Sequence, residues 1–175
     1  MEINIIKMKK NWSLKILNSF KKLIELDDDL KYIVNKYNLP VSRKEGNSFE
    51  TLMRIIISQQ ISRKAAESIY QKLKNKKITS YRNFLKTDDN YLKDLGLSLR
   101  KIIYIKDLAI NINQNKINLK EFENLPSEDV YNSLIKIKGI GKWTINNYQL
   151  FVLEDCDAWP GGDLAIQEAI KSLKN

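Results

Sequence analysis

The chain has 175 residues, of which 43% are hydrophobic, so it has enough apolar side chains to build a core in one domain or in two small lobes that share it. Its 30 Lys and Arg exceed its 21 Asp and Glu, and the net charge of +9 favours a polyanionic partner. The absence of histidine and the single cysteine, Cys156, exclude a histidine base, a zinc site, an intramolecular disulfide and a cysteine-ligated iron–sulfur cluster.

The N-terminal residues 1–10 contain one short apolar patch, residues 3–6, between charged residues. This patch is too short for a secretory signal, and no apolar run in the sequence reaches membrane-spanning length. We therefore expect a protein that is not secreted, has no membrane partner, and is cytoplasmic and associated with the nucleoid, or nuclear in a eukaryote.

Two helices are predicted before residue 40. Apolar residues recur at helical spacing on one face of residues 14–26, and these are Leu14, Leu17, Phe20 and Ile24. The three aspartates at 27–29 begin a second helix that reaches residue 37, because acidic residues complement the positive end of the helix dipole. We interpret them as a solvated cap and not as a metal site. A loop with Pro40 and Gly46 follows over residues 39–47.

The middle of the chain predicts six more helices and no convincing strand pair. Two helices with clear apolar periodicity follow Ser48 and Ser62, and two short helices follow at 79–85 and 88–95. Gly96 ends the second of these, and a long helix opens within residues 97–101. Pro126 and Ser127 start the next helix, with acidic residues in its first turn. The fold prediction is therefore all-α.

Residues 137–144, Ile-Lys-Gly-Ile-Gly-Lys-Trp-Thr, separate two apolar helical segments. Glycines at 139 and 141 predict a tight hairpin whose backbone N–H groups can approach an anion closely. Lys142 then lies in the first turn of a helix, where a cation is unfavourable unless a phosphodiester binds there. The turn alone leaves two interpretations open, a phosphate-binding hairpin and an ordinary glycine-capped connection.

Asp163 follows a Pro-Gly-Gly loop and precedes a new apolar run. This pattern predicts a helix that begins with Asp163 at or beside its N-cap. Taken alone, such an aspartate is a structural cap. Its position after a glycine hairpin and a tryptophan-bearing helix is more specific.

Three further segments join the hairpin at 138–144 in this pattern, and in chain order they are Phe-Glu-Thr-Leu at 49–52, Ile-Ser-Gln-Gln-Ile-Ser at 57–62 and Leu-Gly-Leu-Ser-Leu-Arg-Lys at 95–101. Together with Asp163 they resemble the helix-hairpin-helix (HhH-GPD) DNA glycosylase superfamily, in its 3-methyladenine DNA glycosylase II branch, over about residues 27–173. The resemblance implies two helical lobes with the active-site cleft between them. Within a single domain, 1–175, residues 1–46 would pack with the C-terminal lobe, 47–137 would form a helical lobe, and 138–175 would carry the hairpin and the catalytic aspartate.

The resemblance also implies roles for individual residues. Asp163 would be the catalytic aspartate. The base pocket would be lined by Trp143, Asn147, Tyr148 and Trp159. The DNA-binding residues would be Gln59, Gln60, Gly139, Ile140, Gly141, Lys142 and Thr144, with Gln60 filling the gap left by an extruded nucleotide. No cofactor would be required, although the main-chain carbonyls of Ile135, Ile137 and Ile140 would hold a structural Na⁺ or K⁺.

The implied activity is that of a monomeric, monofunctional glycosylase that hydrolyses the N-glycosidic bond of alkylated, 3-methyladenine-like purines in damaged double-stranded DNA and initiates base excision repair. Bifunctional relatives carry a nucleophilic lysine where this chain has Trp143. The family usually continues with further helices beyond the position of Leu173, so a chain that ends at Asn175 implies a truncated reading frame or a more open pocket. Two alternatives stay open: a non-catalytic helix-hairpin-helix DNA-binding protein, and a glycosylase for uracil, oxidised or mismatched bases.

Overall fold

The computed structural model describes residues 12–174, and the expectation for residues 1–10 lies outside this part. Within it the chain is helical without strands, as predicted. The helices are α1 (Leu14–Leu26), α2 (Asp28–Tyr37), α3 (Phe49–Ser58), α4 (Arg63–Asn75), α5 (Tyr81–Lys86), α6 (Asp89–Asp94), α7 (Leu99–Asn113), α8 (Ser127–Leu134), α9 (Lys142–Phe151) and α10 (Leu164–Lys174). The short 3₁₀ helix Glu121–Glu123 lies between α7 and α8 and was not predicted.

Each of the first seven helices, α1 to α7, begins at a side-chain cap. In each, a serine or aspartate oxygen accepts a hydrogen bond from an N–H group of the first turn, and these caps are Ser13, Asp27, Ser48, Ser62, Ser80, Asp88 and Ser98. The predicted starts of these helices agree with the structure within about two residues. The interpretation of Asp27 as a cap is confirmed.

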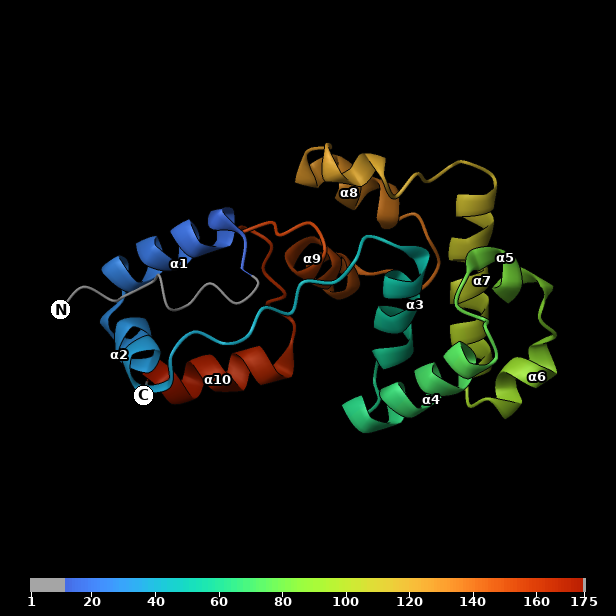
Figure 1. Cartoon of the computed structure of the whole chain (residues 1–175), viewed down its shortest axis with the longest axis horizontal. Helices are drawn as coiled ribbons and strands as arrows, with labels where there is room; N and C mark the ends of the chain where they lie inside the picture. The colour runs from blue at the N-terminus through green and yellow to red at the C-terminus, as the bar shows by residue number, and fades with distance from the viewer. Residues whose placement is uncertain (1–11, 175) are drawn as a thin grey trace.

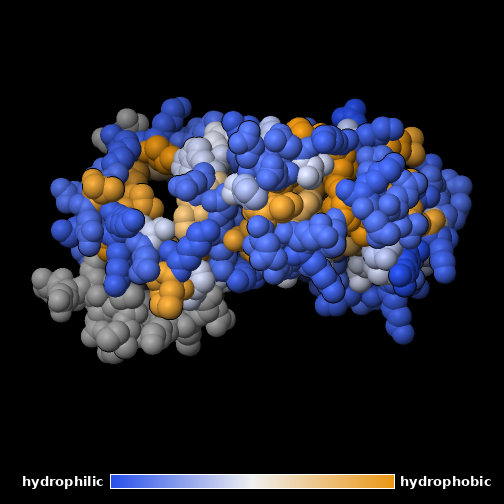
Figure 2. Space-filling model, turned by 90° about the horizontal axis from the view of Figure 1, so that it is seen from above, coloured by the Kyte–Doolittle hydropathy of each residue, from blue (hydrophilic) through white to orange (hydrophobic). Residues whose placement is uncertain are grey.

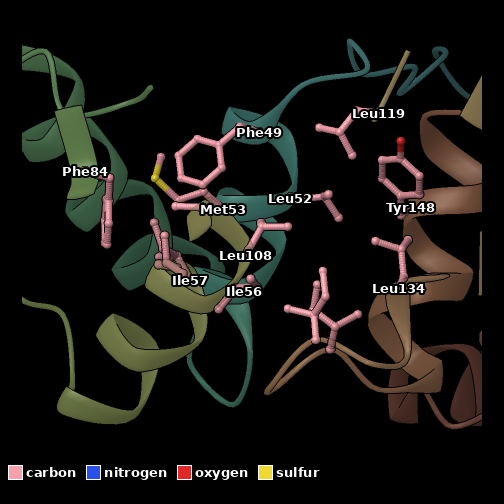
Figure 3. Packing of buried hydrophobic residues seen from close by; sticks show 14 of the residues in the cluster. Phe49, Leu52, Met53, Ile56, Ile57, Phe84, Leu108, Leu119, Leu134 and Tyr148 are labelled. Atoms are coloured by element: carbon pink, nitrogen blue, oxygen red, sulfur yellow. The ribbon is translucent and has the colours of Figure 1, made fainter. Parts of the chain in front are cut away.

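The molecule is elongated, with α1, α2 and α10 at one end and α4, α5, α6 and α7 at the other (Figure 1). The main core lies around α3, where Leu52, Met53 and Ile56 are fully buried (Figure 3). It extends through α7 to Leu134 of α8 and Tyr148 of α9. α3 therefore packs with α4 and α7 on one side and with α9 on the other, and this packing fixes the hairpin between α8 and α9.

The end of the molecule that contains α1, α2 and α10 is packed less tightly. No residue of α2 or α10 is buried, and Lys174 joins the two helices by ion pairs of 2.8 Å to Asp27 and 2.7 Å to Asp29. Hydrophobic side chains border a hollow at this end of the molecule in Figure 2. Within residues 12–174, no helix combines the length and the apolar character needed to cross a bilayer.

Candidate active site

Asp163 is held at both of its carboxylate oxygens. One oxygen, Oδ1, accepts hydrogen bonds from the N–H groups of Ala165 at 2.9 Å and Ile166 at 3.4 Å, and so caps α10. The other, Oδ2, accepts the indole N–H of Trp143 at 2.9 Å. The bond from Trp143, helped by the two backbone N–H groups, lowers the pKa of Asp163. The side chain is therefore both a cap and an oriented anion at neutral pH.

Asp163 lines a cleft of about 660 Å³ between α9 on one side and α3 and α4 on the other. Trp143, Asn147 and Phe151 face this cleft from α9. Their spacing of four residues places them on one face of the helix. Trp143 and Asn147 are therefore where the sequence predicted them. Phe151 was missed, although the same spacing would have found it.

An arginine network forms the opposite wall of the cleft. Arg54 pairs with Glu45 at 3.0 Å and with Glu67 at 3.8 Å, and its guanidinium lies 4.7 Å from the centre of the Tyr70 ring. The Tyr70 hydroxyl donates a short hydrogen bond to Glu50. Burial and this bond raise the pKa of Tyr70 to about 12, so the phenol stays neutral. The sequence prediction missed the network, because its members approach one another only in the folded chain.

Two of the predicted pocket residues lie elsewhere. Tyr148 is 0% exposed and packs in the core, where its hydroxyl donates to Asn47 at 2.6 Å. It points away from the face of α9 that carries Trp143 and Asn147, since adjacent helical residues differ by about 100°. Trp159 is 58% exposed and borders a separate surface hollow beside α10. Both pocket predictions are therefore wrong.

The hairpin adopts the conformation that its glycines predict. Gly139 has a φ of +76°, and Gly141 is the N-cap of α9 without a capping side chain. The first N–H groups of α9 are therefore available to an anion. Beside them lies a groove of about 740 Å³, lined by Gln60, Arg100 and Lys101 as well as by both glycines.

The neighbouring glutamines have different environments. Gln60 is exposed, has a φ of +56° and lines the groove, as its predicted DNA-facing role requires. Gln59 donates through Nε2 to the Gly139 carbonyl at 2.9 Å and to Thr144 Oγ1 at 3.0 Å. Thr144 is buried and its side chain is directed to the protein, so the DNA contact predicted for it is left to its main-chain N–H in the first turn of α9.

The predicted cation ligands are main-chain atoms of the hairpin. The side chains of Ile137 and Ile140 are buried, whereas Ile135 is half-exposed. The Ile137 carbonyl accepts the N–H of Ile140 at 3.1 Å. A carbonyl oxygen has two lone pairs, so this bond leaves capacity for a metal ligand.

Comparison with known proteins identifies the family. Residues 53–175 match the sequence profile described as "HhH-GPD superfamily base excision DNA repair protein", which is more than half of the chain. The chain belongs to the HhH-GPD superfamily. The matched part of this HhH-GPD protein contains Gln60, the hairpin and Asp163, whereas Glu45 and Glu50, which hold Arg54 and Tyr70, precede it.

Relatives agree with this assignment. DNA-3-methyladenine glycosylase 1 of Schizosaccharomyces pombe is 29% identical over 177 residues, which cover 98% of this HhH-GPD chain and 71% of the relative. The structure of Schizosaccharomyces pombe 3-methyladenine DNA glycosylase (Mag1) in complex with abasic DNA superposes with a TM-score of 0.80 at 28% identity, over 90% of this chain and 80% of that one. The DNA-3-methyladenine glycosidase of Bacillus halodurans gives 0.76 at 27% identity, over 92% and 74%.

Proposed function

We propose that this HhH-GPD protein is a monofunctional DNA glycosylase that releases alkylated purines from duplex DNA, acting as a monomer in base excision repair. The observation that carries the proposal is the Asp163 carboxylate, held between the Trp143 indole and the first turn of α10 at the edge of a cleft. The names of its relatives, DNA-3-methyladenine glycosylases, support the choice of substrate class.

The hairpin and Gln60 suit the binding of duplex DNA. The N–H groups at the start of α9, with the exposed side chain of Lys142 beside them, can bind a backbone phosphate. The damaged nucleotide must leave the base stack before it can enter the cleft, which costs a few kcal/mol. The exposed Gln60 amide can fill the resulting gap and hydrogen-bond to the opposite base.

The cleft suits an alkylated, cationic base. The faces of Trp143 and Phe151 attract a positively charged ring more strongly than a neutral one. Bond cleavage sends the N-glycosidic electron pair to the base, which leaves neutral, and puts positive charge on the sugar. The Asp163 carboxylate stabilises this charge and orients a water, whose oxygen forms the new bond to C1′ while one of its protons passes to the carboxylate.

The cleft also supports hydrolysis over strand cleavage. A lyase reaction through a Schiff base needs a lysine amine beside the sugar. Among the described residues that line the cleft there are three arginines but no lysine. The resemblance of the sequence to the family places Trp143 where bifunctional relatives have the nucleophilic lysine. Lys142 lies one residue earlier and outside the cleft. We expect an abasic site as the product, with both strands intact.

The proposed reaction requires no organic cofactor, and the hairpin offers a site for one monovalent cation. No organic cofactor takes part in hydrolysis by a carboxylate and water. We further propose that the carbonyls of Ile135, Ile137 and Ile140 hold a Na⁺ or K⁺ ion, which would help the hairpin to bind phosphate. The unused lone pair of the Ile137 carbonyl supports this arrangement.

The test is release of free base from a methylated duplex by the full chain, followed by alkali. We expect methylpurine release that Asp163→Asn lowers by at least about 100-fold, since loss of one preorganised electrostatic group has effects of this size. Strand breaks should appear only after alkali. Binding of abasic duplex by Asp163→Asn should stay within about threefold of wild type, because the hairpin is unchanged. Binding without any base release would favour the non-catalytic alternative.

A further inference from the structure

The loop of the hairpin is held from three sides. The Lys138 N–H donates to Asp107 Oδ2 at 2.9 Å, and the Gly139 carbonyl accepts from Gln59 Nε2 at 2.9 Å. The ring of Tyr104 lies against the third side, where a Cβ added to Gly139 would meet its Cδ2 at 2.0 Å. We call Gln59, Tyr104 and Asp107 the hairpin socket.

The socket joins two helices that are far apart in the sequence. Tyr104 and Asp107 lie one turn apart on α7, and Gln59 is the C-cap of α3. Lys101 of α7 donates through Nζ to the Ile57 carbonyl at 2.6 Å, so the end of α3 is also bound directly to α7. The end of α3, α7 and the hairpin loop therefore form one connected unit.

Gln60 follows the socket residue Gln59 directly. Its φ of +56° turns the chain at the end of α3, and its exposed side chain lines the same groove as the hairpin glycines. Any shift of Gln59 away from Gly139 would therefore change the distance between Gln60 and the N–H groups that open α9. The socket sets the separation between the phosphate-binding element and the gap-filling side chain.

We propose that Gln59, Tyr104 and Asp107 are positioning residues for base extrusion, because they hold Gln60 at a fixed distance from the phosphate-binding hairpin. This inference rests on the proposed function, since only an enzyme that extrudes a base needs that distance. Gln60 offsets the cost of unstacking only if it is already oriented when the phosphate binds. Gln59 and Tyr104 border the hairpin groove, but none of the three socket residues lines the cleft that contains Asp163.

The experiment compares two duplexes with the full chain under single-turnover conditions. In one, the methylated adenine is paired with thymine, and in the other it lies opposite an abasic site, where extrusion costs less. Gln59→Ala should lower base release from the paired duplex about tenfold, the change that about 1.4 kcal/mol makes in a rate constant. Release from the unpaired duplex should fall less than about threefold. The fluorescence rise of a 2-aminopurine placed beside the lesion should fall with the paired rate.

Controls separate positioning from folding. Gln114→Ala removes an exposed glutamine outside the groove and should leave both rates unchanged. Asp107→Ala opens the socket from the opposite side and should reproduce the selective loss, which keeps the test valid if Gln59→Ala unfolds at the assay temperature. The pH profile should not move, because Asp163 is untouched.

Two results would overturn the inference: equal losses on both duplexes, which indicate a structural role, and no loss on the paired one. If the wild type releases no base from either duplex, the proposed function fails. The 2-aminopurine signal, which needs no catalysis, would then still report whether Gln59→Ala impairs extrusion.

Discussion

The two hairpin glycines differ in what an added methyl group would meet, and alanine substitutions should separate their roles. Gly139 has a φ of +76°, and a Cβ there would lie 2.0 Å from the Tyr104 ring. Left-handed backbone costs an alanine about 1–2 kcal/mol, and overpacking adds about 1–3 kcal/mol. Gly141 has a φ of −106° and nothing within 4 Å of an added Cβ. In Gly141→Ala, alanine is a poorer N-cap than glycine, which lowers the free energy of unfolding, but it also restricts the unfolded chain, which raises it. The two effects cancel to within about 1 kcal/mol.

Thermal unfolding followed by circular dichroism measures the difference. For a domain of this size, about 2–5 kcal/mol at Gly139→Ala corresponds to a fall in Tm of about 4–20 °C, against less than about 4 °C for Gly141→Ala. Gly141→Ala should instead weaken binding of abasic duplex and reduce its salt dependence, because the methyl group stands where a phosphate approaches α9. Equal changes in Tm for the two variants would refute this reasoning.

A double mutant tests the assigned cause. Tyr104→Ala removes the ring that an alanine at position 139 would strike, so Gly139→Ala should cost less in the Tyr104→Ala background than in wild type. The backbone term of about 1–2 kcal/mol should remain, since the φ is unchanged. Strict additivity of the two substitutions would show that the Tyr104 ring is not the obstacle.

The remaining predictions concern α9. Trp143→Phe removes the donor that lowers the pKa of Asp163, so that pKa should rise and the acidic limb of the base-release profile should move to higher pH; an unmoved limb would exclude the indole as the cause. Tyr148→Phe should lower the free energy of unfolding by about 0.5–1.5 kcal/mol through the lost bond to Asn47. Its rate of base release and its preference among bases should not change. A changed preference would indicate that Tyr148 does contribute to the base pocket.

Local features of the chain could be predicted because their causes lie within a few residues. A serine or aspartate cap bonds to an N–H group two or three residues ahead, so the starts of α1, α2 and α4 could be found without the fold. The turn at Gly139 follows from the freedom of glycine at positive φ. For the same reason Asp163 could be identified as the residue that begins α10.

The side chains that share the cleft could be predicted only in part. Trp143, Asn147 and Phe151 follow from helical spacing once the exposed face of α9 is known, but which face is exposed depends on packing against α3 and α8. For this reason Asn147 lines the cleft, whereas the adjacent Tyr148 is buried in the core. The Arg54 network likewise needs residues of α3, α4 and the preceding loop to meet.

The sequence by itself determined the helices, the glycine hairpin and the capping aspartate, because propensity, capping and turn geometry act over a few residues. Only the tertiary structure decided that, of the two glutamines that line the groove, Gln59 uses its amide to hold the hairpin while Gln60 stays exposed. The partners of Gln59 at Gly139 and Thr144 are 80 and 85 residues away, and hydrophobic burial around α3 brings them within hydrogen-bonding distance.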